Sequence, residues 1–318
     1  MTAPAPSAPP ALGPLLARGA LLSPFKRPRP GAVFSGGRLT LPRLRVDPAR
    51  SAAYERVCGF PTGADALPVT YPHVLGFPLA VRIMSGRAFP LPLLGLVHTS
   101  ISLTRHRSLP VTGTYELLVH VDRLAPHRRG TEAVVVTGLR QDGETVWESE
   151  STYLARHRTP GRDAGRETGR ETGRETGRET GRETGQETGQ DAGQEAGRVA
   201  SSAAGPLPVV DEWRLGADVG RRYGSVSGDR NPIHLSPLTA RLFGFPRAIA
   251  HGMWTAARCL AAHGAPDAAR VHVDFRAPVL LPGTVAFAAG GGRFELRGTG
   301  GEGRVHVRGR VEPVTPAG

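Results

Sequence analysis

The sequence predicts an α+β fold built from two similar repeats, each a mostly antiparallel sheet wrapped around one long apolar helix. Three observations support this prediction. First, three landmarks recur in the same order in the two halves of the 318-residue chain. Second, each half has one long apolar stretch that suits a buried helix. Third, each half continues with runs such as TEAVVVTGL and VHVRGRV, in which apolar and polar residues alternate as they do in half-buried strands.

The landmarks are one tyrosine motif and two histidines in each half. The motif Tyr-x-x-Val-x-Gly occurs at residues 54–59 and again at 223–228. One histidine opens the apolar helix, and the other stands at the start of the strand that follows. With their preceding residues, these are Pro72-His73 and Ala250-His251 for the helix, and Val97-His98 and Val271-His272 for the strand. Repetition of this kind indicates two copies of one structural plan.

Four strands are expected after the helix in each half. In the first half they lie near residues 95–104, 114–123, 131–140 and 145–155, and in the second half near 271–276, 284–290, 293–298 and 303–311.

Two stretches of unusual composition bound the repeats. Residues 1–30 are rich in proline and alanine and are expected to form a disordered tail. Residues 159–205 are expected to be a disordered linker, because nine Gly-[Arg/Gln]-[Asp/Glu]-[Thr/Ala] units fill 161–196. A glycine at every fourth position costs a helix about 1 kcal/mol each, and no apolar stripe offsets this cost. The repeats are therefore expected at 31–158 and 206–314.

Composition excludes several classes of protein. The formal charge is +12, but the basic residues are almost all arginine and are not interleaved with aromatics, so no nucleic-acid partner is expected. Two cysteines exclude a disulfide scaffold, and eleven scattered histidines without acidic partners at ligand spacing indicate no metal site. No apolar run approaches the ~20 residues of a membrane span. A cytoplasmic protein is expected.

The stretch YGSVSGDRNPIHLS, residues 223–236, is expected to be an irregular loop that carries chemistry. Gly228 permits a tight backbone, and Pro232 keeps Asn231 out of helix. A stiff loop of this kind can bring the side chains of Asp229 and His234 together. A carboxylate and an imidazole with no serine or cysteine between them suit the activation of a water molecule. The alternative is a merely structural, hydrogen-bonded turn.

A second motif, IAHGMWTAARCL at 249–260, begins the apolar helix of the second half. The first turn of a helix has free N–H groups and partial positive charge, and Gly252 lets a ligand approach them closely. These groups could polarise a carbonyl and stabilise an enolate. Beside a water-activating pair, this arrangement suits addition of water to a double bond conjugated to a carbonyl, or the reverse elimination.

Together these motifs resemble the hydratase-2 motif of the MaoC-like dehydratases. The matching positions are Tyr223, Ser227, Gly228, Asp229, Asn231, Pro232, Ile233, His234, Gly244, Phe245, Ile249, Ala250, His251, Gly252 and Met253. The resemblance implies a double hot-dog fold whose repeats pair within the chain, and a further homodimer is compatible with it. It also implies that Asp229 and His234 are the catalytic pair, that Gly252 provides the oxyanion hole, and that Asn231 orders the loop.

The reaction implied by the resemblance is reversible (R)-specific hydration of trans-2-enoyl-CoA, or dehydration of 3-hydroxyacyl thioesters, in fatty-acid or polyketide-type metabolism. Coenzyme A or acyl carrier protein would be part of the substrate, and no separate cofactor is expected. The first half resembles the degenerate repeat of double hot-dog hydratases. On the internal alignment Phe60 replaces Asp229, Asp65 stands at the position of His234, and Val74 replaces Gly252. One active site per chain is expected.

Several further residues are candidates for the site, and most of them have two possible roles. Ser227 either hydrogen-bonds Asp229 or serves only the turn. His251 either contacts the ligand or packs. Met253 and Trp254 line either the acyl tunnel or the core. Arg247 and Arg276 are candidates for binding the phosphates of coenzyme A.

Two other functions remain open on the sequence alone. A thioesterase of the same fold would release free coenzyme A from saturated acyl-CoA, and the hydratase-type loop argues against it. A non-catalytic acyl- or sterol-binding module would bind its ligand without consuming it, and such a module has no need of Asp229.

Overall fold

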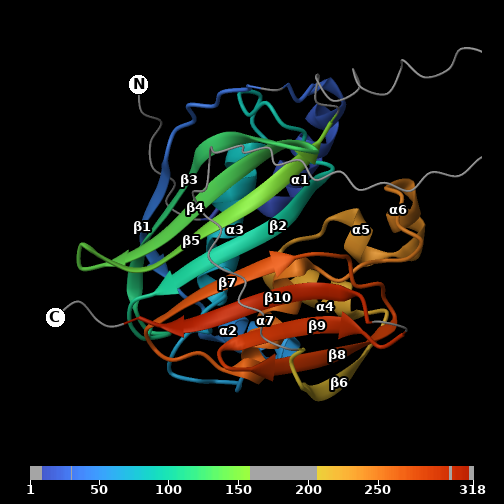
Figure 1. Cartoon of the computed structure of the whole chain (residues 1–318). Coiled ribbons are helices and arrows are strands. Elements are labelled where there is room, and N and C mark those ends of the chain that lie inside the picture. Colours follow the sequence, from blue (N-terminus) through green and yellow to red (C-terminus); the bar gives the residue numbers. More distant parts are fainter. Residues whose placement is uncertain (1–8, 30, 158–205, 301–302, 315–318) are drawn as a thin grey trace, which may run out of the picture. The chain divides into compact units, whose positions relative to one another are not determined.

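The computed structural model describes residues 9–29, 31–157, 206–300 and 303–314. Within these residues, ten strands form one sheet in the order β1-β3-β4-β5-β2-β7-β10-β9-β8-β6. Figure 1 shows the strands of the first repeat in blue to green beside those of the second repeat in yellow to red. The linker expected at 159–205 lies outside the described residues.

The two repeats have the same succession of elements. The first consists of β1 (Leu39–Arg45), α2 (Pro48–Cys58), α3 (Tyr71–Met84), β2 (Leu96–Arg105), β3 (Thr114–His127), β4 (Gly130–Gln141) and β5 (Glu144–Arg156). The second consists of β6 (Val209–Leu215), α4 (Val219–Ser227), α5 (Pro232–Leu235), α6 (Pro237–Leu242), α7 (Gly252–His263), β7 (Ala269–Phe275), β8 (Gly283–Gly290), β9 (Arg293–Gly298) and β10 (Val305–Pro313). Only the short helices α5 and α6 have no counterpart among the described elements of the first repeat.

The strand order within the two repeats is also the same. Read from the outer edge inward, it is β1-β3-β4-β5-β2 in one and β6-β8-β9-β10-β7 in the other. The repeats join through the antiparallel pair β2–β7, from Ser100 opposite Asp274 to Arg105 opposite Ala269. The predicted α+β double hot-dog is therefore confirmed, and its two halves pair within one chain.

All eight strands predicted from alternation are present, and two strands were missed. The missed strands, β1 and β6, form the two edges of the sheet. Most of the β6 side chains are exposed, and β1 contains Pro42 within a register shift between Leu41 and Leu44. Edge strands tolerate proline and need no continuous buried face, so their alternation is weak.

The tyrosine motif forms a helix end in both repeats rather than a loop. The segment 223–236 was expected to contain no regular helix, and this is wrong, because α4 extends to Ser227 and the single turn of α5 occupies Pro232–Leu235. Both helices end at the glycine of the motif, Gly59 with φ 83° and Gly228 with φ 78°. This left-handed conformation is the usual end of a helix and is favourable for glycine.

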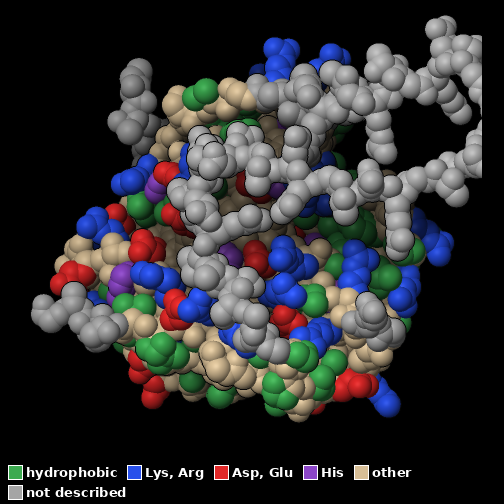
Figure 2. Space-filling view, viewed as in Figure 1, with side chains coloured by type: hydrophobic (Ala, Val, Ile, Leu, Met, Phe, Trp, Pro, Cys, Tyr) green, Lys and Arg blue, Asp and Glu red, His purple; other side chains and the backbone are tan. Residues whose placement is uncertain are grey.

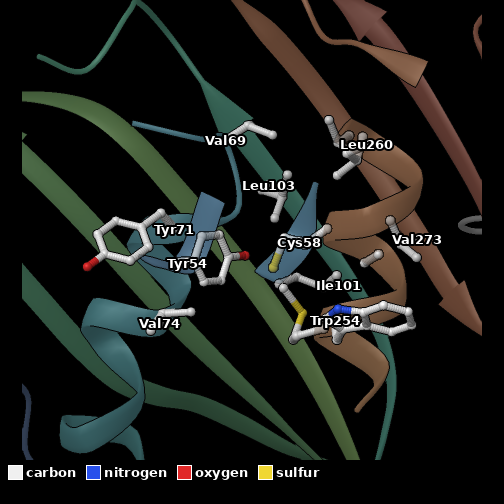
Figure 3. Close-up of a cluster of buried hydrophobic side chains, with 14 of the residues drawn as sticks. Tyr54, Cys58, Val69, Tyr71, Val74, Ile101, Leu103, Trp254, Leu260 and Val273 are labelled. Atoms are coloured by element: carbon white, nitrogen blue, oxygen red, sulfur yellow. The ribbon is translucent and has the colours of Figure 1, made fainter. Parts of the chain in front are cut away.

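The core between the repeats contains side chains from both of them. The rings of Tyr54 and Tyr223, equivalent residues of the motif, lie 6.1 Å apart between centroids. Figure 3 shows Tyr54 and Cys58 of α2 together with Trp254 of α7 in one cluster of buried side chains. Burial of aromatic side chains across this interface holds the repeats together.

The N-terminal region also differs from the prediction. A disordered tail was expected through residue 30, but residues 12–22 form helix α1 (Leu12–Leu22), followed by a 3₁₀ turn at Ser23–Phe25. Ser23 Oγ accepts a hydrogen bond from Leu94 N at 2.9 Å. Lys26 Nζ donates to the carbonyls of Met84 and Gly86 at 3.0 and 2.9 Å, and thereby caps the end of α3. Composition alone cannot reveal such long-range contacts.

The described surface offers two simple observations. No described helix is both long and apolar enough to cross a membrane. Figure 2 shows that the arginine side chains on this face are spread out, with acidic side chains between them, on the part not covered by grey atoms.

Candidate active site

Asp229 is held by the end of α4. Ser227 Oγ donates to the carbonyl of Tyr223 at 2.8 Å and accepts the N–H of Asp229 at 3.2 Å. The carboxylate oxygen Oδ1 of Asp229 in turn accepts the N–H of Asn231 at 3.2 Å. Both interpretations of Ser227 are thus combined, because its hydroxyl closes the turn and also fixes the backbone of Asp229.

His234 lies on the single turn of α5. Asn231 caps this turn, since its Oδ1 accepts the N–H of Ile233 at 3.4 Å. His234 Nδ1 lies 2.8 Å from the carbonyl oxygen of Ile249. A carbonyl only accepts, so Nδ1 carries the hydrogen and Nε2 keeps a free lone pair. Burial lowers the pKa of His234, and the imidazole is therefore neutral at pH 7.

His251 contacts both members of this pair. Its Nε2 donates to the main-chain carbonyl of Asp229 at 2.9 Å and lies 3.8 Å from the carboxylate oxygen Oδ2. Its ring stacks on that of His234, with 3.7 Å between the centroids. Burial lowers the pKa of His251 to about 3, and the neighbouring His234 contributes in the same direction. His251 therefore packs and also positions the two groups beside it.

Asp229, His234 and His251 form a compact cluster. One ligand-type atom from each lies within 4.8 Å of the others. No spacing in the sequence predicts a metal site, yet the fold brings two imidazoles and a carboxylate together. Both His234 Nδ1 and His251 Nε2 carry hydrogens for their carbonyl partners. The His234 Nε2 lone pair and the Asp229 carboxylate are therefore the groups left to hold a water molecule.

Gly252 is the first residue of α7. The preceding residue, His251, gives no side-chain cap to this helix, and among the described residues the Gly252 N–H has no acceptor. A side-chain carbon at this position would meet the ring of Phe275 at 3.2 Å, so a larger residue requires that ring to shift by a few tenths of an ångström. A free N–H at a helix start, reinforced by the helix dipole, can bind a carbonyl oxygen that gains negative charge.

These groups open into a cavity of about 980 Å³ between the repeats. Asp229, His234, His251 and Gly252 all line it, as do the candidates Met253 and Arg276. Its other walls come from α1, α3, β2, β5 and β7. The structure thus brings the predicted acid, imidazole and helix start to one hollow, which is large enough for a substantial organic ligand.

Two predicted substrate contacts do not line this cavity. Trp254 is buried in the core, and its Nε1 donates to the carbonyl of Val57 at 3.0 Å (Figure 3). Arg247 is exposed and donates to the carbonyl of Pro282 at 2.9 Å. Successive residues of a helix point in different directions, so Met253 faces the cavity while Trp254 faces α2.

The first repeat contributes wall residues rather than a second acid–imidazole pair. Phe60 packs near Tyr54, with 6.4 Å between ring centroids, and Asp65 is exposed in a separate hollow. Val74 lines the main cavity. Three further cavity residues had no predicted role in the site: His73, His98 and Tyr153. The two histidines are landmarks of the internal repeat, and their recurrence was the one signal that pointed to them.

Comparison with known proteins gives concordant matches. A family model described as MaoC like domain matches residues 191–302. The 3-hydroxyacyl-thioester dehydratase X of Mycobacterium tuberculosis is 34% identical over 262 residues, which span 81% of this chain and 82% of that protein. A segment of 67 residues is 43% identical to fatty acid synthase subunit beta of Aspergillus oryzae, and it covers 19% of this chain and 3% of that protein.

Solved structures match over most of the chain. The crystal structure of HtdX from Mycobacterium tuberculosis has a TM-score of 0.67 at 30% identity, and the match covers 87% of this chain and 100% of that one. A MaoC-like dehydratase from Phytophthora capsici shares the fold, with a TM-score of 0.64 at 18% identity and coverage of 89% and 96%.

The fold and the site define a double hot-dog protein whose described residues place one acid–imidazole pair between two repeats. The length and identity of the matches go further: this chain belongs to the MaoC-like dehydratase family.

Proposed function

We propose that the protein is a hydro-lyase that interconverts trans-2-enoyl thioesters and (3R)-3-hydroxyacyl thioesters. The observation that carries this proposal is the placement of Asp229, His234 and the free N–H of Gly252 on the wall of one cavity. The 34% identity to a 3-hydroxyacyl-thioester dehydratase supports the same reaction. The similarity of a short segment to a fatty acid synthase subunit supports a place in fatty-acid or polyketide-type metabolism.

The thioester carbonyl is bound at the start of α7. The Gly252 N–H donates to its oxygen, and the helix dipole stabilises the negative charge that builds up there as the enolate forms. This interaction strengthens in the transition state, so it accelerates the reaction rather than merely tightening binding.

Asp229 and His234 handle the water. In the hydration direction, the carboxylate and the lone pair of His234 Nε2 hold a water molecule over the β-carbon. As the water oxygen bonds to this carbon, its proton passes to the pair, and the double-bond electrons move toward the α-carbon and the thioester oxygen. The α-carbon then takes a proton on the same face. The net change is addition of one water, and dehydration reverses each step.

The cavity accommodates the acyl chain between the repeats. Its volume of about 980 Å³ lies at the upper end of the range of ligand pockets, which suits an acyl chain longer than crotonyl. The carrier is coenzyme A or acyl carrier protein, and the exposed guanidinium of Arg276 on the cavity wall is placed to bind a phosphate of either.

The decisive assay uses purified protein and a panel of 2-enoyl thioesters, offered on both carriers. We expect loss of enoyl absorbance and a product that is the (3R) alcohol by chiral analysis. Release of free coenzyme A from saturated acyl-CoA, without hydration, would indicate a thioesterase instead. Tight binding without any turnover would indicate a non-catalytic acyl- or sterol-binding module.

A further inference from the structure

Three polar side chains of the first repeat form a band on the cavity wall, which we call the polar band: His73 of α3, His98 of β2 and Tyr153 of β5. The ring of His98 stacks on Tyr153 at 4.5 Å and on His73 at 5.8 Å between centroids. The reaction proposed above uses none of these groups. Tyr153 and His73 are only 8% and 7% exposed, while His98 between them is half-buried.

Two nitrogens of the polar band lack hydrogen-bond partners. His73 Nδ1 and His98 Nε2 are buried and bond to no other described residue. Burial lowers the pKa of His73 to about 4 and that of His98 well below its usual range, so both rings are neutral. Leaving such groups unpaired destabilises the folded protein. Because both nitrogens have almost no accessible surface, a rotation of the rings toward the cavity is needed for a polar group on the ligand to pair with them.

The polar band lies next to the reacting centre. His98 contacts the ring of Phe275, with 4.9 Å between centroids, and Phe275 is the ring that a side chain at Gly252 would meet at 3.2 Å. The Asp229 carboxylate acts electrostatically on both His73 and Tyr153. The band therefore adjoins the position of the thioester and the reacting carbons.

Beyond the polar band the channel becomes apolar. On α3, Val74, Phe77, Val81 and Met84 line the cavity after His73, and the last three follow His73 along one face of the helix. At 1.5 Å per residue, Met84 lies about 16 Å farther along the axis than His73. Leu16 and Ala20 of α1 line the same cavity. A chain extending along α3 would thus pass the polar band first and an apolar chamber afterwards.

We propose that the polar band binds a hydroxyl or keto oxygen on the acyl chain, so that the preferred substrates are acyl thioesters with an oxygen function a few carbons beyond the β-carbon. This inference rests on the proposed function, because it assumes that the thioester sits at Gly252. Neutral imidazoles and a phenol offer both donors and acceptors, and they match a neutral oxygen better than a carboxylate or a phosphate.

The test compares two 2-enoyl-CoA esters of equal chain length, one plain and one with a hydroxyl on the fifth carbon. The measured quantity is the ratio of kcat/KM for the hydroxylated ester to that for the plain ester. We expect this ratio to fall roughly tenfold in Tyr153→Phe and in His98→Phe, since each loses a hydrogen bond to the hydroxyl and keeps a stacked ring. Phe77→Leu is the matched control: it reshapes the apolar chamber and leaves the ratio unaltered.

A ratio that stays constant in both polar-band variants would overturn the inference, because water or packing would then be the partner of these groups. Calorimetric binding of the corresponding saturated esters to Asp229→Asn separates the two proposals. A preference for the hydroxylated ester that Tyr153→Phe abolishes supports the polar band even if the enzyme hydrates neither ester. Equal affinity for both esters counts against it even if hydration is rapid.

Discussion

The two repeats share their order of elements and their strand arrangement, yet only the second carries the acid–imidazole pair. One difference lies at the start of the long helix. In the second repeat α7 starts at Gly252, whose N–H has no acceptor among the described residues. In the first repeat α3 starts at Tyr71, and Val74, the residue aligned with Gly252, is the fourth residue of that helix. The long helix supports the fold in both repeats, but only in the second does the residue after the histidine begin the helix.

The other difference follows the glycine of the tyrosine motif. After Gly228, Asp229 and Asn231 turn the chain into α5, which holds His234 at the cavity. After Gly59, the ring of Phe60 packs against the core instead. The comparison indicates that the hot-dog framework is independent of the chemistry, which depends on two short segments. The following predictions test this separation.

The largest effect is expected for Asp229→Asn. Asparagine keeps the size and the Asn231 contact but cannot take a proton from water, so we expect kcat to fall about 10³-fold or more. The control is the same substitution at an aspartate of the first repeat, Asp65→Asn. We expect its kcat to lie within about twofold of the unmodified protein's, because Asp65 is exposed and outside the main cavity. Near-normal turnover of crotonyl-CoA by Asp229→Asn would contradict the assignment of the catalytic residue.

A smaller but still large effect is expected for Gly252→Pro. This variant removes the N–H that we assign to the oxyanion hole and leaves the rest of α7 unchanged. Proline is tolerated at the first position of a helix, and His251 already has an extended backbone with φ −65° and ψ 137°.

The control for this prediction is Gly252→Ala, which keeps the N–H and adds the same close contact with Phe275. We expect kcat of Gly252→Pro to be about 10²-fold below that of Gly252→Ala. Equal rates for the two variants, measured with the same enoyl thioester, would show that another group binds the carbonyl.

A structural feature of this molecule can be predicted from the sequence when it depends on neighbouring residues, and not when it depends on contacts between distant segments. Alternation identified the central strands, and the loop motif identified Asp229, His234 and Gly252 as a group. Helix α2 was missed, because its sequence PARSAAYERVC has little apolar periodicity. Its helical state depends on the Asp47 cap, on Gly59 and on packing against α4 and α7. Contacts between distant segments decide such elements, and a local pattern does not contain them.

The same limit applies to the site. The direction of Trp254 toward α2, rather than into the cavity, depends on how α7 is rotated against the first repeat. The polar band joins residues from three elements far apart in sequence, so no spacing rule could have grouped His73 with Tyr153. Helix α1 was missed for this reason as well, since Ser23 and Lys26, which follow it, bond to Leu94 and Met84, some sixty to seventy residues away along the chain.

Helix α1 is expected to influence which acyl-chain lengths the protein accepts. It follows the channel: Leu12 lies against Gly228 at one end, and Lys26, just beyond the helix, binds the end of α3 at the other. Ala20→Phe should fill the apolar chamber and lower kcat/KM for a long-chain enoyl-CoA about tenfold more than for crotonyl-CoA. Leu21→Ser, on the exposed side of α1, is the control and should change neither. A uniform loss for all chain lengths in Ala20→Phe would instead indicate damage to the catalytic loop.

The smallest expected effect is on the pH dependence of stability. It can be compared at the equivalent histidines of the two repeats, His73 and His251. Burial lowers their pKa values to about 4 and about 3, whereas the unfolded chain titrates near its ordinary value of 6.5. Below pH 6.5 the unfolded state therefore binds more protons, and the free energy of unfolding falls as the pH falls toward the folded-state pKa. Each histidine contributes about 1.4 kcal/mol per pH unit to this slope.

Denaturant unfolding between pH 6 and pH 4.5 measures the slope directly. His73→Phe and His251→Phe should each make the slope shallower by about the contribution of one histidine. The two variants should differ in activity, because His251 bonds to the carbonyl of Asp229 and stacks on His234, while His73 touches neither member of the pair through a hydrogen bond. We therefore expect kcat for crotonyl-CoA to fall further in His251→Phe. An unchanged slope in either variant would mean that this histidine is already charged in the folded protein, and the burial argument for that repeat would be wrong.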